Sequence, residues 1–279
     1  MPLRALRRDR AARNGTELFL FERAFEDCLE RLGLVQRRFE NALLIGCPDP
    51  AWPRRLGELV AHVDVADPGA LFAQAAGGQT VVEDRWEPRP DAFDLVLAIG
   101  TLDSVNDLPR ALKSIAAAMR ADSLFIGALS GGDTLPQLRH AMRAADAVAG
   151  SAAPHVHPRI EAAALAPLLA QAGFTGPVVD VDRVQVAYRS LDRLIADLRA
   201  MAATNLLLAR SRRPLGRIAY AAAAAEFARC AEEDGKTTET FEILHLSGWA
   251  PSPDQPSPAR RGSATASLAD ALRGPNRPD

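Results

Sequence analysis

Apolar segments between residues 41 and 100 are each followed by a glycine or an acidic residue. Gly46 and Cys47 follow the run ALLI, Asp64 or Asp67 closes the next segment, and Asp84 follows VVE. A glycine turn lets the backbone approach a ligand, and carboxylates at the ends of successive strands can accept hydrogen bonds from ribose hydroxyls and an adenine amino group. This spacing predicts a binding site for a nucleoside-containing ligand.

Some of these residues also have purely structural interpretations. Asp67 precedes Pro68 and could cap a helix; we favour Asp64 as the acid that binds the ribose, with both left open. Asp84 could be only a loop acid. Cys47 is interpreted as a small buried residue rather than a nucleophile, because no histidine lies near it in the sequence.

The elements that must position these residues alternate between strands and helices. Short continuous apolar runs are typical of strands buried on both faces of a parallel sheet, and helical patterns of ten or more residues lie between several of them. This alternation predicts an α/β fold with right-handed crossovers and a mostly parallel sheet with helices on both faces. The strands are expected at 42–47, 62–67, 79–84, 93–100, 123–129, 178–188 and 237–250.

The chain divides into five parts by pattern. The stretch 191–233 is nearly all helical, with a break at Pro214, and is predicted to form a lid over the pocket mouth. The end of the chain is so rich in proline, serine and arginine that we expect it to be disordered or to lie on the surface. The parts are an N-terminal arm and first helix (1–40), a core (41–190), a helical lid insertion (191–235), a final core strand (236–250) and a tail (251–279).

Composition excludes several classes of protein. A net charge of -2 argues against a general nucleic-acid binder. The sequence contains no run of 18 apolar residues, so it predicts no membrane span. The three cysteines lie far apart, without the spacing of a metal site or a disulfide framework. The first fourteen residues are arginine-rich, as in a mitochondrial transit peptide, but Asp9 interrupts them. We therefore expect a cytoplasmic bacterial protein, with the mitochondrial matrix as the less favoured location.

Polar stretches outside the core have alternative interpretations. SGGDTL (130–135) is either a turn in which Asp133 or Thr134 caps the next helix, or a wall of a substrate pocket. In PHVHP, His155 and His157 could bind a metal, but a surface or lid loop is favoured because no third ligand is evident. The cluster in RSRRPLGR is either a solvated helix end or a patch for an acidic partner: Arg210, Arg212, Arg213 and Arg217.

The order of the first motifs resembles that of class I S-adenosylmethionine-dependent methyltransferases. LIGCPDP takes the place of the glycine-rich first motif, VVEDRW holds the third-strand acid, and FDLVLAIGTLDSV forms the fourth-strand motif. The resemblance implies a Rossmann-like fold, S-adenosylmethionine as the cofactor, and no metal. The cofactor-binding residues that it implies are Gly46, Cys47, Asp64, Asp84, Arg85 and Gly100.

A narrower resemblance covers nearly the whole chain. VNDLPRAL, GALSGGDTLPQLRHAM, DLRAM, RSRRPL and FEILHLSGWAP are similar to the methyltransferase-like family of NADH dehydrogenase (complex I) assembly factor 5. That family is similar to the malonyl carrier-protein methyltransferases of biotin synthesis. It implies a role in complex I assembly, with a complex I subunit as partner, peripheral association with a membrane through that partner, and arginine hydroxylation in the mitochondrial branch.

Two departures from these families affect function. Pro48 and Pro50 fill glycine-like places of the first motif, where proline supplies no N–H and cannot adopt a positive φ. Asp103 and Ser104 replace a His-Trp pair of many relatives, and Asp103 is the only candidate catalytic acid that the motif offers. We expect a methyltransferase-fold protein that acts on a protein partner; the alternatives are a non-catalytic assembly factor and a small-molecule methyltransferase.

Overall fold

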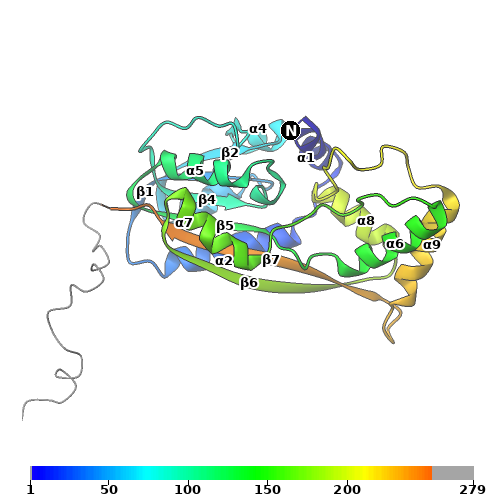
Figure 1. Cartoon of the computed structure of the whole chain (residues 1–279). Helices are drawn as coiled ribbons and strands as arrows, with labels where there is room; N and C mark the ends of the chain where they lie inside the picture. Colours follow the sequence, from blue (N-terminus) through cyan, green and yellow to red (C-terminus); the bar gives the residue numbers. More distant parts are fainter. Residues whose placement is uncertain (1, 253–279) are drawn as a thin grey trace, which may run out of the picture.

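The computed structural model describes residues 2–252. Its sheet has seven strands in the order β3-β2-β1-β4-β5-β7-β6. The strands from β3 to β5 are parallel, and β7 runs antiparallel between β5 and β6. This sheet confirms the predicted fold class (Figure 1). The strands are β1 (Phe39–Ile45), β2 (Val60–Asp67), β3 (Gln79–Thr80), β4 (Phe93–Ile99), β5 (Met119–Ser130), β6 (Thr175–Tyr188) and β7 (Thr237–Trp249).

Helices cover both faces of the sheet because neighbouring strand residues point to opposite sides. Leu44 belongs to a core with α2 (Phe19–Gly33) and α3 (Trp52–Leu56), where the rings of Phe25 and Trp52 stack 4.3 Å apart. Ile45 belongs to the opposite core with α5 (Leu108–Ala118) and α7 (Ala162–Ala172). The apolar run ALLI is therefore buried on both faces, as its pattern predicts.

The two long strands β6 and β7 extend beyond the parallel strands and carry a separate group of helices, seen at the right of Figure 1. The predicted lid contains α8 (Leu191–Ala200), a stretch without helix at 201–216, and α9 (Arg217–Arg229). α6 (Pro136–Ala149), which the sequence placed in the core part, packs with them around Phe241 of β7. These helices therefore form a small layer with an apolar core of their own.

The N-terminal segment differs most from the expectation of an arm. It forms helix α1 (Pro2–Asn14), which packs against α8 and against α4 (Ala70–Ala75). Strand limits also differ: β3 ends at Thr80 rather than at 84, and β5 begins at Met119 rather than at 123. No helix in residues 2–252 has the length and apolarity needed to cross a membrane. Most of the predicted tail, 253–279, lies outside the described residues.

Candidate functional site

The turn after β1 needs a glycine. Gly46 has a φ of +85°, and a Cβ there would lie 2.2 Å from the carbonyl oxygen of Ile99. Its N–H donates to the carbonyl of Ala66 at 2.8 Å, so the turn is fixed to the end of β2. Gly100, after β4, has a φ of +61°, and a Cβ there would lie 2.3 Å from the ring of Phe21. Both predicted glycines therefore allow close packing at the carboxyl ends of adjacent strands.

Cys47 is buried, and its backbone N–H contacts the acid at the end of β2. Its N–H donates to Oδ2 of Asp67 at 2.8 Å, and its Sγ donates to the carbonyl of Asp49. Burial, followed by the charges of Asp67 and Asp49, raises the pKa of the Cys47 thiol to about 12. A protonated thiol is a poor nucleophile, which agrees with the interpretation of Cys47 as a structural residue.

The acid at the carboxyl end of β2 is Asp67 rather than Asp64. Asp64 is exposed and lies in the middle of the strand, paired in register with Leu43. Asp67 is the last residue of β2 and is fully buried. Since each strand residue advances the chain by about 3.3 Å, the three-residue difference moves the carboxylate roughly 10 Å along the strand. The structure thus brings Asp67, and not Asp64, to the turn at Gly46.

Asp84 follows β3 and is 5% exposed. Its Oδ1 atom has no hydrogen-bond partner. Native proteins pair most buried polar atoms, so an unpartnered carboxylate oxygen marks a place where a donor can bind. Arg85, its neighbour, is exposed and is not part of this buried group.

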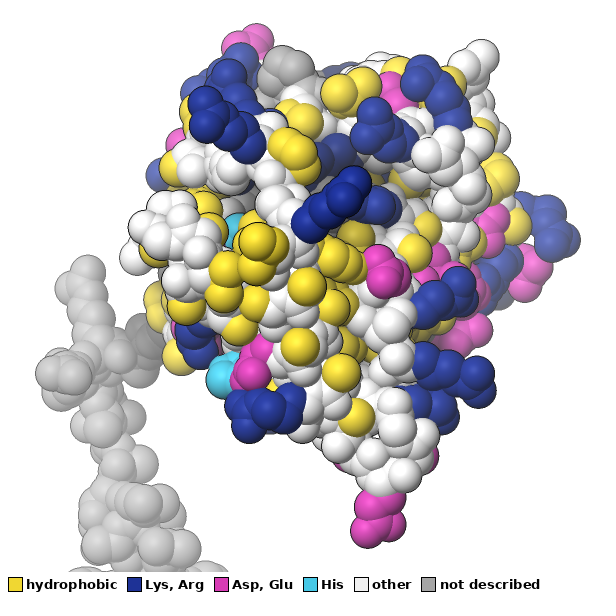
Figure 2. Space-filling view, turned by 90° about the vertical axis from the view of Figure 1, so that its right-hand side faces the viewer, with side chains coloured by type: hydrophobic (Ala, Val, Ile, Leu, Met, Phe, Trp, Pro, Cys, Tyr) yellow, Lys and Arg dark blue, Asp and Glu magenta, His cyan; other side chains and the backbone are white. Residues whose placement is uncertain are grey.

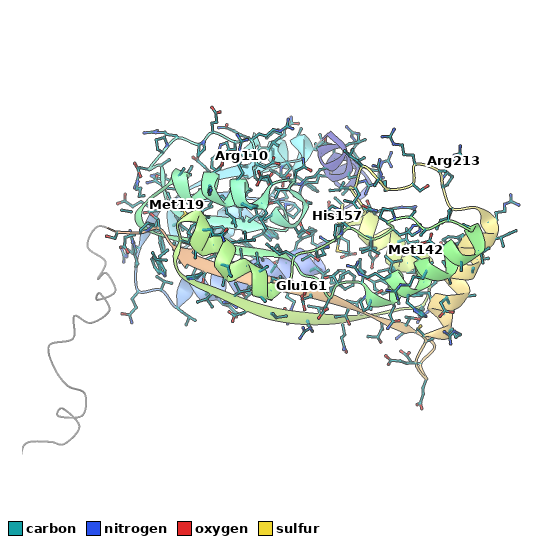
Figure 3. The ribbon with its side chains drawn as sticks, viewed as in Figure 1. Arg110, Met119, Met142, His157, Glu161 and Arg213 are labelled. Carbon is teal, nitrogen blue, oxygen red and sulfur yellow. The ribbon has the colours of Figure 1, made fainter. Side chains whose placement is uncertain are left out.

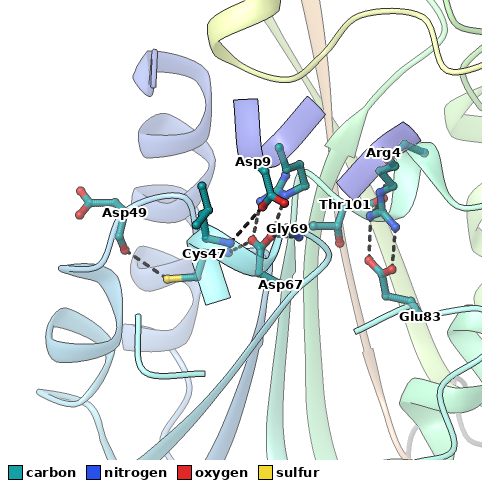
Figure 4. A network of polar contacts seen from close by, with 11 residues as sticks. Arg4, Asp9, Cys47, Asp49, Asp67, Gly69, Glu83 and Thr101 are labelled. Atoms are coloured by element: carbon teal, nitrogen blue, oxygen red, sulfur yellow. Dashed lines mark hydrogen bonds and ion pairs between the residues drawn. The ribbon is translucent and has the colours of Figure 1, made fainter. Parts of the chain in front are cut away.

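Helix α1 inserts two arginines among these acids (Figure 4). Arg8 donates from Nε to Oδ1 of Asp67 at 2.7 Å and from Nη2 to Oδ2 at 2.5 Å. Arg4 donates to both oxygens of Glu83, at 2.7 and 2.8 Å, and to the carbonyl of Thr101 at 2.6 Å. Burial alone would lower the pKa of Arg8, but Asp67 raises it. Both arginines are therefore held as charged partners of buried acids.

These two ion pairs are not among the contacts predicted from the sequence. Arg4 and Arg8 are four positions apart, which places both on one face of a helix, so a helix over residues 2–14 is the signal that the expectation of an arm misses. The acids that they contact, Asp67 at the end of β2 and Glu83 after β3, lie far away in the sequence.

A pocket lies beside this group, between the ends of β4 and β5, α2 and the lid. Its apolar lining residues include Phe21, Leu198, Met201 and Phe241. Its polar lining residues include Arg4, Arg8, Asp103, His157 and Arg159. A pocket with this mixed lining can hold a side chain or small molecule that is partly apolar and partly polar.

Asp103 and His157 are two groups in this pocket that could move a proton; a third, Glu242, is paired with Arg183. The Asp103 carboxylate accepts a hydrogen bond from Nη1 of Arg159, whose side chain is 5% exposed. Nε of Arg159 and Nδ1 of His157 are buried without partners. Burial, and then the charge of Arg159, lowers the pKa of His157. His157 is therefore a neutral imidazole at physiological pH with one unpaired ring nitrogen. Figure 3 labels His157 between the sheet and the lid.

The glycine turn SGGDTL contributes to the pocket wall but does not cap α6 as predicted. Ser130, Thr134 and Leu135 line the pocket. The carboxylate of Glu239 on β7 instead accepts from the N–H groups of Gln137, at 3.2 Å, and Leu138, at 2.9 Å. The first-turn N–H groups of the helix are thus satisfied by a residue distant in the sequence, which no local capping pattern can reveal.

The histidine pair is likewise separated. His155 lies 2.8 Å from Asp146 of α6, whereas His157 lines the pocket. Within residues 2–252, no group of three histidine, cysteine or acidic side chains is arranged to hold a metal ion.

Comparison with known proteins defines the class to which this fold and site belong. The profile of the family described as "Methyltransferase domain" matches residues 17–179, more than half of the chain. The YcgJ protein of Bacillus subtilis has a similar solved structure, with a TM-score of 0.57 at 10% identity, covering 82% of this chain and 99% of that chain. The chain therefore belongs to the methyltransferase-domain family, and the structural likeness confirms the fold.

Within that class, the arginine-hydroxylase NDUFAF5 of Danio rerio, a mitochondrial protein, is 39% identical over 261 residues, covering 90% of this chain and 81% of the relative. The malonyl-[acyl-carrier protein] O-methyltransferase of Xylella fastidiosa is 34% identical over 165 residues, covering 59% of this chain and 54% of the relative. The chain thus belongs to the NDUFAF5 family, which confirms the narrower resemblance.

Proposed function

We propose that this chain binds S-adenosylmethionine at the carboxyl ends of its parallel strands and acts on a protein partner during assembly of respiratory complex I. Membership of the NDUFAF5 family supports the partner and the assembly role. Membership of the methyltransferase-domain family supports the cofactor, which supplies an electrophilic methyl group when bound.

The observation that carries the cofactor proposal is the unpartnered Oδ1 of the buried Asp84, which follows β3. An acceptor without a donor at the end of β3 fits an adenine amino group, and a carboxylate at the end of β2 fits ribose hydroxyls. Each oxygen of Asp67 already accepts one bond from Arg8 and one from a backbone N–H. The ribose and Arg8 therefore compete for Asp67. The residues proposed for the cofactor are Gly46, Cys47, Asp67, Asp84 and Gly100.

The adjoining pocket is proposed to receive the acceptor side chain. Phe21 and Met201 exclude water from one side. Nδ1 of His157 can accept a proton if the acceptor arrives protonated, because the neutral imidazole has a free nitrogen. Asp103, the acid suggested by the sequence motif, is held by Arg159 and serves better to orient that guanidinium.

Titration calorimetry of the purified protein with S-adenosylmethionine tests the cofactor proposal. Micromolar binding is expected, whereas no heat at millimolar ligand would overturn it. Deletion of the gene in its host tests the biological role. Loss of complex I activity is expected; biotin auxotrophy with intact complex I would instead support a small-molecule methyltransferase.

One observation favours a second function, that of a non-catalytic assembly factor. Arg8 and Arg4 fill the positions next to Asp67 and Glu83 with guanidinium groups, and Pro48 and Pro50 remove N–H donors from the turn. Such a protein would keep the fold and its partner surface without a cofactor. The same calorimetric titration separates the two functions, because only the first requires binding.

The location in the cell stays a prediction. We retain the proposal of a cytoplasmic bacterial protein, although the name of the Danio rerio relative places that relative in mitochondria. Arg4 and Arg8 are buried in the folded domain, so the arginine-rich segment 2–14 is proposed to act in the site rather than as a removable signal.

A further inference from the structure

A second hollow, distinct from the pocket, lies between α1, α8 and the 201–216 stretch. Among the described residues, no aspartate, glutamate, phenylalanine, tyrosine or tryptophan lines this hollow. We call it the arginine hollow and define it by its five cationic side chains. They are Arg7, Arg10, Arg199, Arg210 and Arg213.

The charges of the arginine hollow are not neutralised within the described part of the chain. None of its five arginines forms an ion pair with any residue in 2–252, in contrast to Arg4 and Arg8 on the neighbouring face of α1. Burial, and then the positive charges of Arg210 and Arg10, lowers the pKa of Arg7. His155 also lines the hollow, but its imidazole faces Asp146. Like charges thus gather at one place and require an anionic partner from outside.

The arginine hollow adjoins the pocket of the candidate site. Thr204 lines both, and Nη1 of Arg7 donates to the Thr204 hydroxyl. Helix α1 therefore presents Arg4 and Arg8 to the site, and Arg7 and Arg10 to the hollow. Dark blue side chains gather on the upper part of the face shown in Figure 2, and Figure 3 labels Arg213 at the outer edge of the 201–216 stretch.

We propose that the arginine hollow binds an acidic segment of the partner protein and so directs a neighbouring side chain of that partner into the pocket. This inference rests on the proposed function, because it assumes that the side chain on which the chain acts belongs to a protein. Guanidinium forks match carboxylates in bidentate geometry, which favours aspartate and glutamate side chains as the ligands.

A polypeptide fits the hollow better than a nucleic acid or a membrane does. Single-stranded nucleic acids are bound by stacking on aromatic side chains, but the described residues of the hollow include no phenylalanine, tyrosine or tryptophan, and the imidazole of His155 faces Asp146. A membrane presents a flat surface, whereas these arginines converge in a concavity that a chain segment can enter. The hollow also continues towards the pocket through Thr204, which gives a bound segment a path to the site.

The test measures fluorescence anisotropy of a labelled peptide of alternating aspartate and serine with the full chain. Phosphatidylcholine–phosphatidylglycerol vesicles and oligothymidine serve as competitors. The test variant is Arg210→Glu with Arg213→Glu. The matched control is Arg212→Glu with Arg217→Glu, which makes the same charge change at one residue of the 201–216 stretch and at the first residue of α9, neither of which lines the hollow. Arg210→Gln with Arg213→Gln supplies a milder test if charge reversal impairs folding.

The wild type and the control are expected to bind the peptide equally, and the test variant about tenfold or more weakly. Equal weakening in both double variants would overturn the proposal, because only net charge would then matter. Absence of peptide binding, or displacement by vesicles or oligothymidine at lower concentration than by unlabelled peptide, would also overturn it. Calorimetry with S-adenosylmethionine on the same variants distinguishes failure of the hollow proposal from failure of the cofactor proposal, since the proposed cofactor residues lie outside the hollow.

Discussion

Arg8 of the N-terminal helix holds both oxygens of Asp67, the acid that ends β2. The side chains of this pair are 5% and 0% exposed, so water does not screen it. The same carboxylate accepts the N–H of Cys47, which follows the glycine turn. One ion pair thus connects α1, the turn after β1 and the end of β2, and it lies where the family's cofactor would need a free acid.

Removing Arg8 is expected to destabilise the fold. Arg8→Ala leaves Asp67 buried without a counter-ion, which costs about 3–5 kcal/mol of unfolding free energy. Arg23→Ala is the matched control, because Arg23 makes the same two-bonded contact with Asp182 but is 55% exposed. The control should lose no more than about 1 kcal/mol. Urea unfolding of the variants measures both, and equal losses would contradict the buried-pair argument.

The competition between Arg8 and the ribose predicts a change in cofactor affinity. Arg8→Gln removes the charge that engages Asp67, so more of the protein has a binding-competent acid. The apparent affinity is lower when a smaller fraction of the molecules can bind. The variant should therefore bind S-adenosylmethionine more tightly than the wild type, by about tenfold or more. Calorimetry gives the dissociation constants. Weaker binding would show that Arg8 contacts the cofactor directly rather than displacing it.

Asp84 is expected to contribute to binding of S-adenosylmethionine but not to the stability of the fold. Because its Oδ1 is buried without a partner, Asp84→Ala should leave the melting temperature unchanged or raise it. The same variant should bind S-adenosylmethionine about tenfold more weakly, by loss of one charged hydrogen bond of about 1.5–3 kcal/mol. Asp64→Ala is the control, since Asp64 is exposed in the middle of β2 and should change neither quantity. A lowered melting temperature for Asp84→Ala would indicate a structural carboxylate instead.

The sequence predicted what depends on local pattern. The apolar runs before Gly46 and Gly100 identified two adjacent strands, and the order of the motifs identified the family. The predicted strand 62–67 ends at Asp67, as β2 does, but it contains both acids, and its pattern does not show which of them lies at the turn after β1. Sheet register resolved it, because pairing of Ile45 with Ala66 extends the strand to Asp67.

Contacts between distant segments could not be predicted from the sequence. The N-terminus of α6 is capped by Glu239, about a hundred residues away in the chain, and not by Asp133 or Thr134, the two caps that the local sequence offered. Arg8 of α1 pairs with Asp67 of β2, and His157, which precedes α7, lines the same pocket as residues of β4, β5 and β7. Such contacts follow from packing in three dimensions rather than from spacing along the chain.

The buried histidine of β7 predicts how stability depends on pH. His245 is 2% exposed, and its Nδ1 lies 2.8 Å from Asp27 of α2. Burial lowers the pKa of His245 below its ordinary 6.5, although Asp27 opposes this effect and Arg31 adds to it. As the pH falls through 6.5, the unfolded chain takes up a proton that the folded chain does not, so stability is complete above this pH and is lost below it. His245→Leu should therefore reduce the fall in melting temperature between about pH 7.5 and about pH 5.5, with His157 still contributing in the same direction. His62→Leu changes an exposed histidine and should keep the wild-type dependence of the melting temperature on pH. If His245→Leu instead has the same pH profile as the wild type, His245 takes up its proton in the folded state as readily as in the unfolded chain.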